Sequence, residues 1–309
     1  MYKGGLAGFS DQPTQFTKSN GITVAYETFG SVQGKPLILV AGLYNQLVRW
    51  PVIFCNYLAE RGFYVIRFDN RDIGLSDHMH GIAAPNLLKQ ALKYRFGFPV
   101  NAPYSLDDMA LDTVGLLDAL HIEKAHLVGM SMGGMICQII AGAFPDRVLS
   151  LTSMMSSSGV VGKGKPSWRI SYQMIKRPSG KKSQTDITVE TLQMFGSPRY
   201  RVSDENIRAM VEAENKRSRN PAGYYRQLAA INTCRNRVPL LRSINTPSLI
   251  IHGKQDLLVP VDGGIDTAKH ITDSKLVLFD GMGHDLPMPL LENFAELITD
   301  NSQNAEVSE

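Results

Sequence analysis

A serine in a short glycine-flanked motif is the feature of this sequence that points most directly to chemistry. Gly129-Met130-Ser131-Met132-Gly133 follows a short apolar run and precedes a helix-like stretch. In a strand–turn–helix setting, this spacing holds the serine backbone in a strained turn that exposes its hydroxyl, and the glycines avoid the Cβ collisions of so sharp a bend. We predict that Ser131 is a nucleophile in such an elbow, with Gly129 and Gly133 on its flanks.

A serine hydroxyl reacts well only when a base takes its proton and a carboxylate orients that base. Asp256 comes just after an apolar run, and His284 lies in a glycine-flanked loop after the last apolar run. Each of the three residues therefore follows an expected strand, in the chain order serine, aspartate, histidine. We predict that His284 is the base and that Asp256 is its partner.

Other residues compete for the roles of base and carboxylate. Six more histidines are present, namely His78, His80, His121, His126, His252 and His270. His126 lies inside an apolar run and His252 ends one, so we expect both to be buried structural residues. Among the carboxylates, Asp262 has the position of a helix N-cap, whereas Asp280 and Asp285 lie too close in sequence to the predicted base to reach its Nδ1 easily.

Acyl transfer also requires hydrogen-bond donors for the oxyanion of the tetrahedral intermediate, each contributing roughly 3 kcal/mol. The backbone N–H of Met132, directly after the serine, is the expected first donor. The second should come from the loop after residues 36–41, where Gly42 lets the backbone turn and Leu43 is the expected donor. A plain glycine-containing loop without this role is the alternative.

Short apolar runs alternate with helix-like stretches along most of the chain, and this alternation predicts the fold. The runs expected as strands cover residues 22–29, 36–41, 64–68, 125–129, 148–154, 248–252 and 275–279. The stretches expected as helices cover residues 52–61, 106–120, 132–144, 262–270 and 290–299. Several runs are nearly continuous in Val, Ile and Leu, as strands buried on both faces must be. We predict an α/β fold with a mostly parallel central sheet and helices on both faces.

The alternation stops between residues 159 and 242. This segment holds 17 Lys and Arg against 6 Asp and Glu, whereas the rest of the chain holds 15 against 23. It contains helix-like stretches, such as 204–217 with Ser203 as N-cap, and no convincing buried strand. We predict a helical cap over residues 159–242 and a core made of residues 1–158 and 243–309. Three explanations of the positive charge stay open: a solvated helical surface, attraction of an anionic substrate, and association with an anionic surface.

Three smaller features complete the organisation of the chain. The irregular segment 83–104 contains a helix-like stretch, 86–96, that we expect to add to the cap, and the tail from Asn301 onward should be frayed. Tyr44, Met174, Met194 and Tyr224 are expected to line an adaptable apolar substrate pocket, although such residues at helical spacing more often serve packing.

Composition bounds the class of protein. The chain has 309 residues, of which 43% are hydrophobic and 20% charged, as in an ordinary globular protein. Its cysteines, Cys55, Cys137 and Cys234, form no paired motif, which argues against a disulfide framework or a metal site and indicates a reducing compartment. We find no secretory signal, no apolar run long enough to span a membrane and no nucleic-acid recognition motif, so we expect a cytoplasmic protein, either monomer or homodimer.

Three segments carry a resemblance to a known family: residues 67–76 (RFDNRDIGLS), the elbow 129–134 (GMSMGG) and residues 145–156 (PDRVLSLTSMMS). Along nearly its full length the chain resembles the α/β-hydrolase superfamily, and within it the aclacinomycin-methylesterase-type carboxylesterases. It departs from many relatives at the oxyanion loop, where they have His-Gly and this chain has Ala41-Gly42. Within 67–76 we expect Asn70, Arg71 and Asp72 to tie the loop together.

The resemblance implies an α/β-hydrolase fold with a helical lid inserted after the sixth strand. It also implies an enzyme that cleaves a small-molecule carboxylic ester, methyl or short to medium chain, with water and without a cofactor. Ser131, His284 and Asp256 would act through an acyl-enzyme. Lactonase, C–C hydrolase and proline iminopeptidase activities use the same triad, and some members of the fold are non-enzymatic ligand receptors, so these alternatives stay open. Haloalkane dehalogenation is disfavoured, because it needs a carboxylate at position 131.

Overall fold

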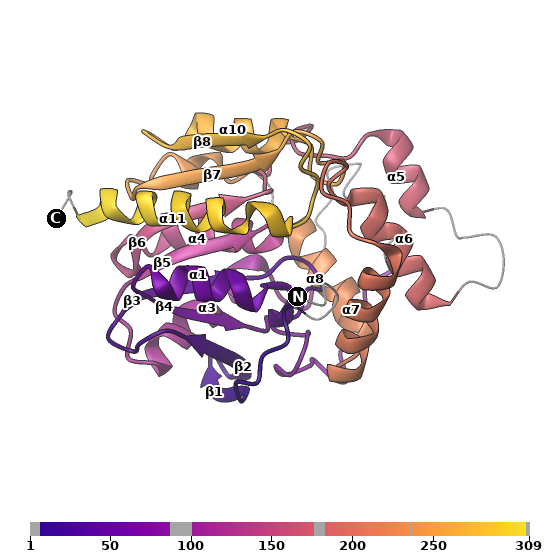
Figure 1. Ribbon diagram of the computed structural model, residues 1–309, viewed down its shortest axis with the longest axis horizontal. Coiled ribbons are helices and arrows are strands. Elements are labelled where there is room, and N and C mark those ends of the chain that lie inside the picture. Colours follow the sequence, from indigo (N-terminus) through magenta and orange to yellow (C-terminus); the bar gives the residue numbers. More distant parts are fainter. Residues whose placement is uncertain (1–6, 87–100, 176–182, 235, 307–309) are drawn as a thin grey trace.

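An eight-stranded sheet in the order β1-β2-β4-β3-β5-β6-β7-β8 forms the centre of the protein (Figure 1). The computed structural model describes residues 7–86, 101–175, 183–234 and 236–306. The strands are β1 (Gln15–Ser19), β2 (Ile22–Phe29), β3 (Lys35–Val40), β4 (Phe63–Phe68), β5 (Ala125–Met130), β6 (Val148–Met154), β7 (Ser248–Gly253) and β8 (Lys275–Phe279). The six strands from β4 to β8 run parallel, and β2 pairs antiparallel with both β4 and β1. This architecture confirms the predicted fold class.

The strand β1 was not predicted. Its sequence QFTKS has little apolar character, and only Ser19 in it is buried. An edge strand of this kind contributes backbone hydrogen bonds more than side-chain burial, so it has no apolar run to reveal it. The other seven strands lie within one residue of their predicted bounds.

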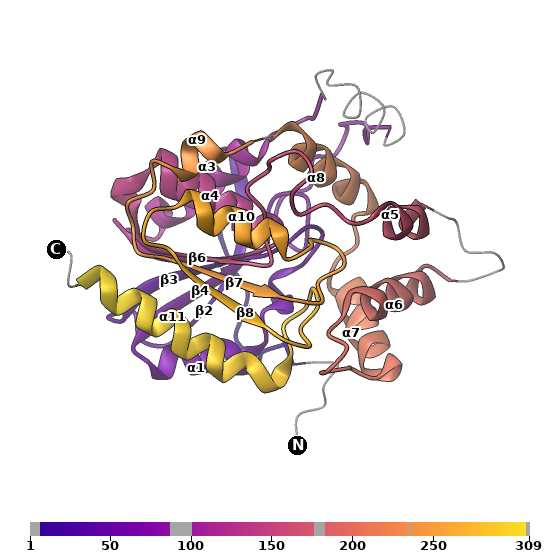
Figure 2. The same cartoon turned by 90° about the horizontal axis from the view of Figure 1, so that it is seen from above.

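Helices cover both faces of the sheet. Figure 2 shows α1 (Val52–Glu60) and α11 (Leu291–Glu306) on one face, and α3 (Leu106–Ala119), α4 (Met132–Ala143) and α10 (Asp262–His270) on the other. The strands alternate between the two apolar cores: Ile38 and Val40 of β3 join the core under α3 and α4, whereas Leu37 and Leu39 join the core under α1 and α11. Both faces of the strand are therefore apolar, which explains why it is a continuous run in the sequence. The short 3-10 helices are η2 (Leu47–Arg49), η3 (Pro145–Arg147) and η4 (Met288–Leu290).

Two predictions about helix ends were wrong. The chain is not frayed from Asn301, because α11 continues to Glu306 and the Asn301 side chain is buried, donating to the Leu151 carbonyl at 3.1 Å. Asp262 is not an N-cap either: Val261 precedes α10 without a side-chain cap, and Asp262 accepts from the Gly164 N–H at 3.1 Å. In both cases a contact with a distant segment replaces the local role that the sequence suggested.

The segment 159–242, called the insertion below, enters between β6 and β7. It forms α5 (Trp168–Ile175), α6 (Gln184–Phe195), α7 (Asp204–Arg217), α8 (Pro221–Thr233) and α9 (Val238–Leu241). The helices α5 to α8 lie beyond the end of the sheet toward which the arrowheads of β7 and β8 point (Figures 1 and 2). Ser203 caps α7 as predicted, accepting from the Asn206 N–H. The helix-like stretch 86–96 lies, except for residue 86, outside the described residues.

Buried ion pairs join the insertion to the core. Arg226 of α8 donates to both carboxylate oxygens of Asp72 at 2.7 Å, and Arg217 of α7 pairs with Asp69 at 2.7 Å. Burial opposes the ionisation of Asp72, yet its bonds to Arg226 and to other donors hold its pKa below the usual range. Part of the positive charge of the insertion therefore neutralises acidic residues of the core, an explanation that the charge pattern alone did not suggest.

We expect Arg226→Met to lower the free energy of unfolding by about 3–5 kcal/mol, because it leaves the buried Asp72 carboxylate without its cation. Urea denaturation near neutral pH measures the change. Arg208→Met is the matched control, since Arg208 makes an ion pair with Asp186 on the surface and its loss should change stability far less. Equal stability changes in the two variants would contradict the structural importance of the buried pair.

Candidate active site

The serine predicted as nucleophile stands in a strained turn between β5 and α4. Ser131 has φ 56° and ψ −117°, a conformation that non-glycine residues rarely adopt. Neighbouring groups hold the turn: the Ser131 N–H donates to the Met154 carbonyl at 2.8 Å, and the Ser156 hydroxyl donates to the Ser131 carbonyl at 2.9 Å. The predicted elbow geometry is present, and the serine side chain remains partly exposed.

The glycines on either side of the elbow have no room for a side chain. A Cβ added at Gly129 would lie 2.3 Å from the Gly133 carbonyl oxygen, and one at Gly133 would lie 2.0 Å from the Val40 carbonyl oxygen. Both atoms belong to backbone, so a larger residue would require the strand or the turn to shift. The spacing of the motif therefore follows from close approach of backbone segments.

His284 and Asp256 are joined as predicted. The His284 Nδ1 lies 2.6 Å from Asp256 Oδ2, and the other carboxylate oxygen accepts from the Leu258 and Val259 N–H groups at 2.9 and 2.8 Å. Burial alone raises the pKa of Asp256, but the charge and hydrogen bonds of His284 and His252 outweigh it and lower the pKa to about 2. Asp256 is therefore an oriented, ionised partner for the imidazole at neutral pH.

The three predicted catalytic residues follow β5, β7 and β8, three strands of one parallel run. Their loops therefore meet at the carboxyl edge of the sheet. The hydrogen bonds of the described residues include none between the Ser131 hydroxyl and His284. Catalytic hydrogen bonds are often long or poorly aligned in unliganded enzymes and shorten when the substrate binds.

The competing residues have other partners. His126 is buried with its Nδ1 2.8 Å from the Ser150 hydroxyl, and Asp285 accepts from Ser197 instead of facing the His284 Nδ1. His252 is fully buried, as expected, with its Nε2 2.8 Å from the Val259 carbonyl and 3.5 Å from Asp256 Oδ2. The contact between His252 and Asp256 was not predicted. The sequence does show that Asp256 lies four residues after His252, near the end of an expected strand.

The expected oxyanion loop lies against the elbow. A Cβ built on Gly42 would lie 3.3 Å from both Ser131 Cβ and the Met130 carbonyl oxygen, so the loop backbone passes next to the serine. The Asn45 N–H donates to the Gly42 carbonyl at 3.2 Å, which closes a tight turn around Leu43. Met132 begins α4 directly after the serine. Both expected donors therefore belong to segments that border Ser131.

The loop 67–76 supports this arrangement from the core, as predicted. The Asn70 side chain donates to the Ala41 carbonyl at 3.1 Å, and Arg71 makes a buried ion pair with Asp112. Asp72, beyond its pair with the insertion, accepts from the Tyr104 hydroxyl at 2.8 Å. These three residues have a structural role, because the side chain of each is hydrogen-bonded or ion-paired to another residue of the protein.

The insertion also contacts the loop of the histidine. The His284 N–H donates to the Phe195 carbonyl at 2.7 Å, and the Gly283 N–H donates to the Ser197 hydroxyl at 2.8 Å. Ser197 is buried and binds the Asp285 carboxylate, the pKa of which is raised by burial. Sequence reasoning missed Ser197, because nothing near it in the chain indicates a partner so far away.

Two of the residues expected to line the substrate pocket, Tyr44 and Tyr224, contact each other in the part of the chain that the structure describes. The rings of Tyr44 and Tyr224 meet edge to face with their centroids 5.6 Å apart. Met194 is partly buried and directly precedes Phe195. The side chain of Met174 lies outside what the structure describes. The substrate pocket therefore stays a prediction for all four residues.

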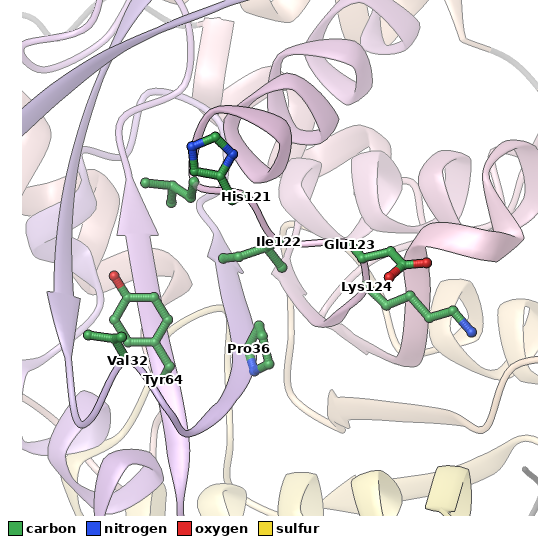
Figure 3. Close-up of a pocket in the computed structure, with 8 residues that line it drawn as sticks. Val32, Pro36, Tyr64, His121, Ile122, Glu123 and Lys124 are labelled. Atoms are coloured by element: carbon green, nitrogen blue, oxygen red, sulfur yellow. The ribbon is translucent and has the colours of Figure 1, made fainter.

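A cavity of about 440 Å³ lies at the amino-terminal end of the parallel strands, opposite the candidate active site, and is not part of that site (Figure 3). Its wall includes residues at the amino ends of β3, β4 and β5, namely Val32, Pro36, Tyr64, Leu120, His121, Ile122, Glu123 and Lys124. The described residues contain no group of three or more His, Cys, Asp or Glu side chains suited to a metal ion. Within the same residues, no helix has the length and apolar character needed to cross a membrane.

Comparison with known proteins agrees with the geometry. A family model described as alpha/beta hydrolase fold matches residues 35–289. The chain is 26% identical to rhodomycin D methylesterase DauP of Streptomyces sp. (strain C5), over 96% of this chain and 100% of that protein. It is 27% identical to 2-hydroxymuconate semialdehyde hydrolase of Pseudomonas sp. (strain CF600), over 74% of this chain and 78% of that protein. The solved structure of the enol-lactonase from Burkholderia xenovorans LB400 has the same fold, with a TM-score of 0.72 and 21% identity. The match covers 94% of this chain and 100% of that chain.

Proposed function

The chain belongs to the alpha/beta hydrolase family, and from this premise we propose that it is a serine hydrolase that cleaves carboxylic esters of small molecules through an acyl-enzyme. The observation that carries the proposal is the strained Ser131 at the end of β5, on the same sheet edge as the hydrogen-bonded pair His284 and Asp256. The likeness to a methylesterase over 96% of the chain supports esters, with methyl or short to medium chains, as the substrate class.

In the first half of the reaction, Ser131 Oγ attacks the ester carbonyl while the His284 imidazole takes its proton. The carbonyl oxygen becomes an oxyanion, which the backbone N–H groups of Met132 and Leu43 stabilise. His284 then protonates the leaving alcohol as the bond to it breaks, and the acyl group remains on Ser131. The ionised Asp256 holds the imidazole in the right tautomer and stabilises its protonated form.

In the second half, the same groups act on water. His284 takes a proton from a water molecule as its oxygen attacks the acyl carbonyl, and the oxyanion again lies between the two N–H donors. Collapse of the intermediate returns the proton to Ser131 Oγ and releases the carboxylic acid. The insertion, over residues 159–242, would act as the cap that limits access to this edge of the sheet and selects the acyl and alcohol groups.

A substrate panel tests the reaction class. We expect the highest kcat/KM on methyl or short-chain esters, and lower values on lactones, aminoacyl amides and a substrate cleaved at a C–C bond, because the pocket decides among reactions that share one triad. Initial rates across the panel, with acyl length varied from acetate to decanoate, measure the preference. C–C cleavage is the second candidate, because 2-hydroxymuconate semialdehyde hydrolase is a relative of similar identity. Turnover confined to that substrate would overturn the ester proposal, and no turnover at all would favour a ligand receptor.

A further inference from the structure

Resting on the proposed function, we propose that Gln227 of α8 is a positioning residue for the oxyanion loop. Its side chain accepts a hydrogen bond from the Tyr44 N–H at 2.8 Å. That N–H belongs to the peptide that follows Leu43, so the bond fixes the orientation of the peptide next to the proposed donor. The insertion thereby takes part in transition-state stabilisation in addition to covering the site.

Gln227 is placed to hold this peptide firmly. Its side chain is fully buried, and both ends of the amide are used: the oxygen binds the Tyr44 N–H, and the nitrogen donates to the Arg71 carbonyl at 2.8 Å. A buried amide with both ends bonded cannot rotate without losing two hydrogen bonds. It therefore connects the oxyanion loop to the loop 67–76 of the core.

The loop needs such a restraint because its backbone is strained. Tyr44 has φ 58°, in the left-handed region that is unfavourable for a residue with a side chain. A peptide next to a strained residue relaxes easily when its hydrogen bond is removed. Relaxation of the Leu43–Tyr44 peptide would turn the Leu43 backbone away from the geometry that two-donor stabilisation requires.

The helix that carries Gln227 is itself anchored to the core. The neighbouring Arg226 pairs with Asp72, and the Asn220 side chain donates to the Asp72 carbonyl at 3.0 Å. On the other side of the loop, Gln46 donates to the Glu214 and Ser218 carbonyls at 2.9 and 3.1 Å. Two helices of the insertion therefore hold the segment that follows the proposed oxyanion donor.

The test compares two substitutions of Gln227. Gln227→Met keeps the length of the side chain and removes both hydrogen bonds, whereas Gln227→Glu, assayed at a pH at which the buried carboxyl is protonated, keeps an acceptor for the Tyr44 N–H and a donor for the Arg71 carbonyl. For Q227M we expect kcat on p-nitrophenyl acetate to fall about tenfold with KM within about twofold, since the lost interaction matters in the transition state. Binding of phenylboronic acid, which forms a tetrahedral anion on the serine oxygen, should weaken by the same factor. Q227E should recover most of both losses.

A direct readout and a stability control separate positioning from folding. Hydrogen exchange of the Tyr44 amide should be faster in Q227M than in the wild type and protected again in Q227E. Ala229→Gly on the same helix lowers helix stability and leaves the hydrogen bond from Tyr44 to Gln227 in place, so its kcat should stay near the wild-type value. The inference is overturned if kcat of Q227M matches the wild type, if A229G loses as much activity, or if boronate binding is unchanged. A wild type without ester turnover would instead overturn the proposed function.

Discussion

Replacing Ser131 with alanine is expected to lower kcat/KM for an ester by about 10⁴- to 10⁶-fold while the protein stays folded. The loss should be this large because no other hydroxyl stands in the strained turn next to the oxyanion loop. Alanine fits the position, since it only removes the Oγ atom. Steady-state kinetics on a short-chain ester, with circular dichroism as a check of the fold, measure the effect.

Ser302→Ala serves as the matched control for this substitution. Ser302 is also a buried serine, but it lies on α11 and donates to the Thr299 carbonyl, away from the elbow. Its loss should leave kcat/KM close to the wild-type value. A fluorophosphonate probe should label the wild type and Ser302→Ala, but not Ser131→Ala. If Ser131→Ala kept its activity within tenfold of the wild type, Ser131 would not be the nucleophile and the acyl-enzyme mechanism would have to be abandoned.

The second large effect is expected from Asp256→Asn, which should lower kcat by about 10³- to 10⁴-fold with a small change in KM. Asparagine keeps the shape of the side chain, but it cannot stabilise the imidazolium and favours the wrong tautomer of His284. Asp262→Asn is the control, since Asp262 follows in the next helix and its carboxylate is partly exposed. A kcat of Asp256→Asn within a factor of ten of the wild type would remove Asp256 from the proposed triad.

The stability of the protein in acid offers an independent measurement on the same residue. The pKa of Asp256 is about 2 in the folded protein, below the ordinary value of 3.8 for an aspartate, so its ionised form stabilises the fold by about 2 kcal/mol above pH 4. This stabilisation is lost as the pH falls from 4 toward 2. The difference in unfolding free energy between the wild type and Asp256→Asn should therefore shrink by a similar amount over this range. A difference independent of pH would mean that the carboxylate has no special stabilisation in the folded state.

The insertion forms direct hydrogen bonds with two loops of the candidate active site. It contacts the oxyanion loop through Gln227 and the histidine loop through Phe195 and Ser197. The two loops would carry the donor and the base in the proposed mechanism. Changes in the insertion are therefore expected to alter kcat as well as substrate selection.

The sequence alone was enough to find the fold and the elbow. Seven of the eight strands are marked by apolar runs, and the elbow is marked by glycines at a fixed distance from Ser131. These signals are local, because a buried parallel strand must be apolar on both faces and a sharp turn must lack side chains at its flanks. The strand β1 escaped notice because an exposed edge strand is subject to neither requirement.

Only the tertiary structure decided which side chains hold the loops of the site. Gln227 lies 183 positions from Tyr44, and Ser197 lies 88 positions from Asp285. A hydrogen bond between residues so far apart requires only a polar side chain at each end, and many polar side chains in the insertion could satisfy that requirement equally well. The packing of α6 and α8 on the core selects the partners, so their identity becomes visible only when the chain is folded.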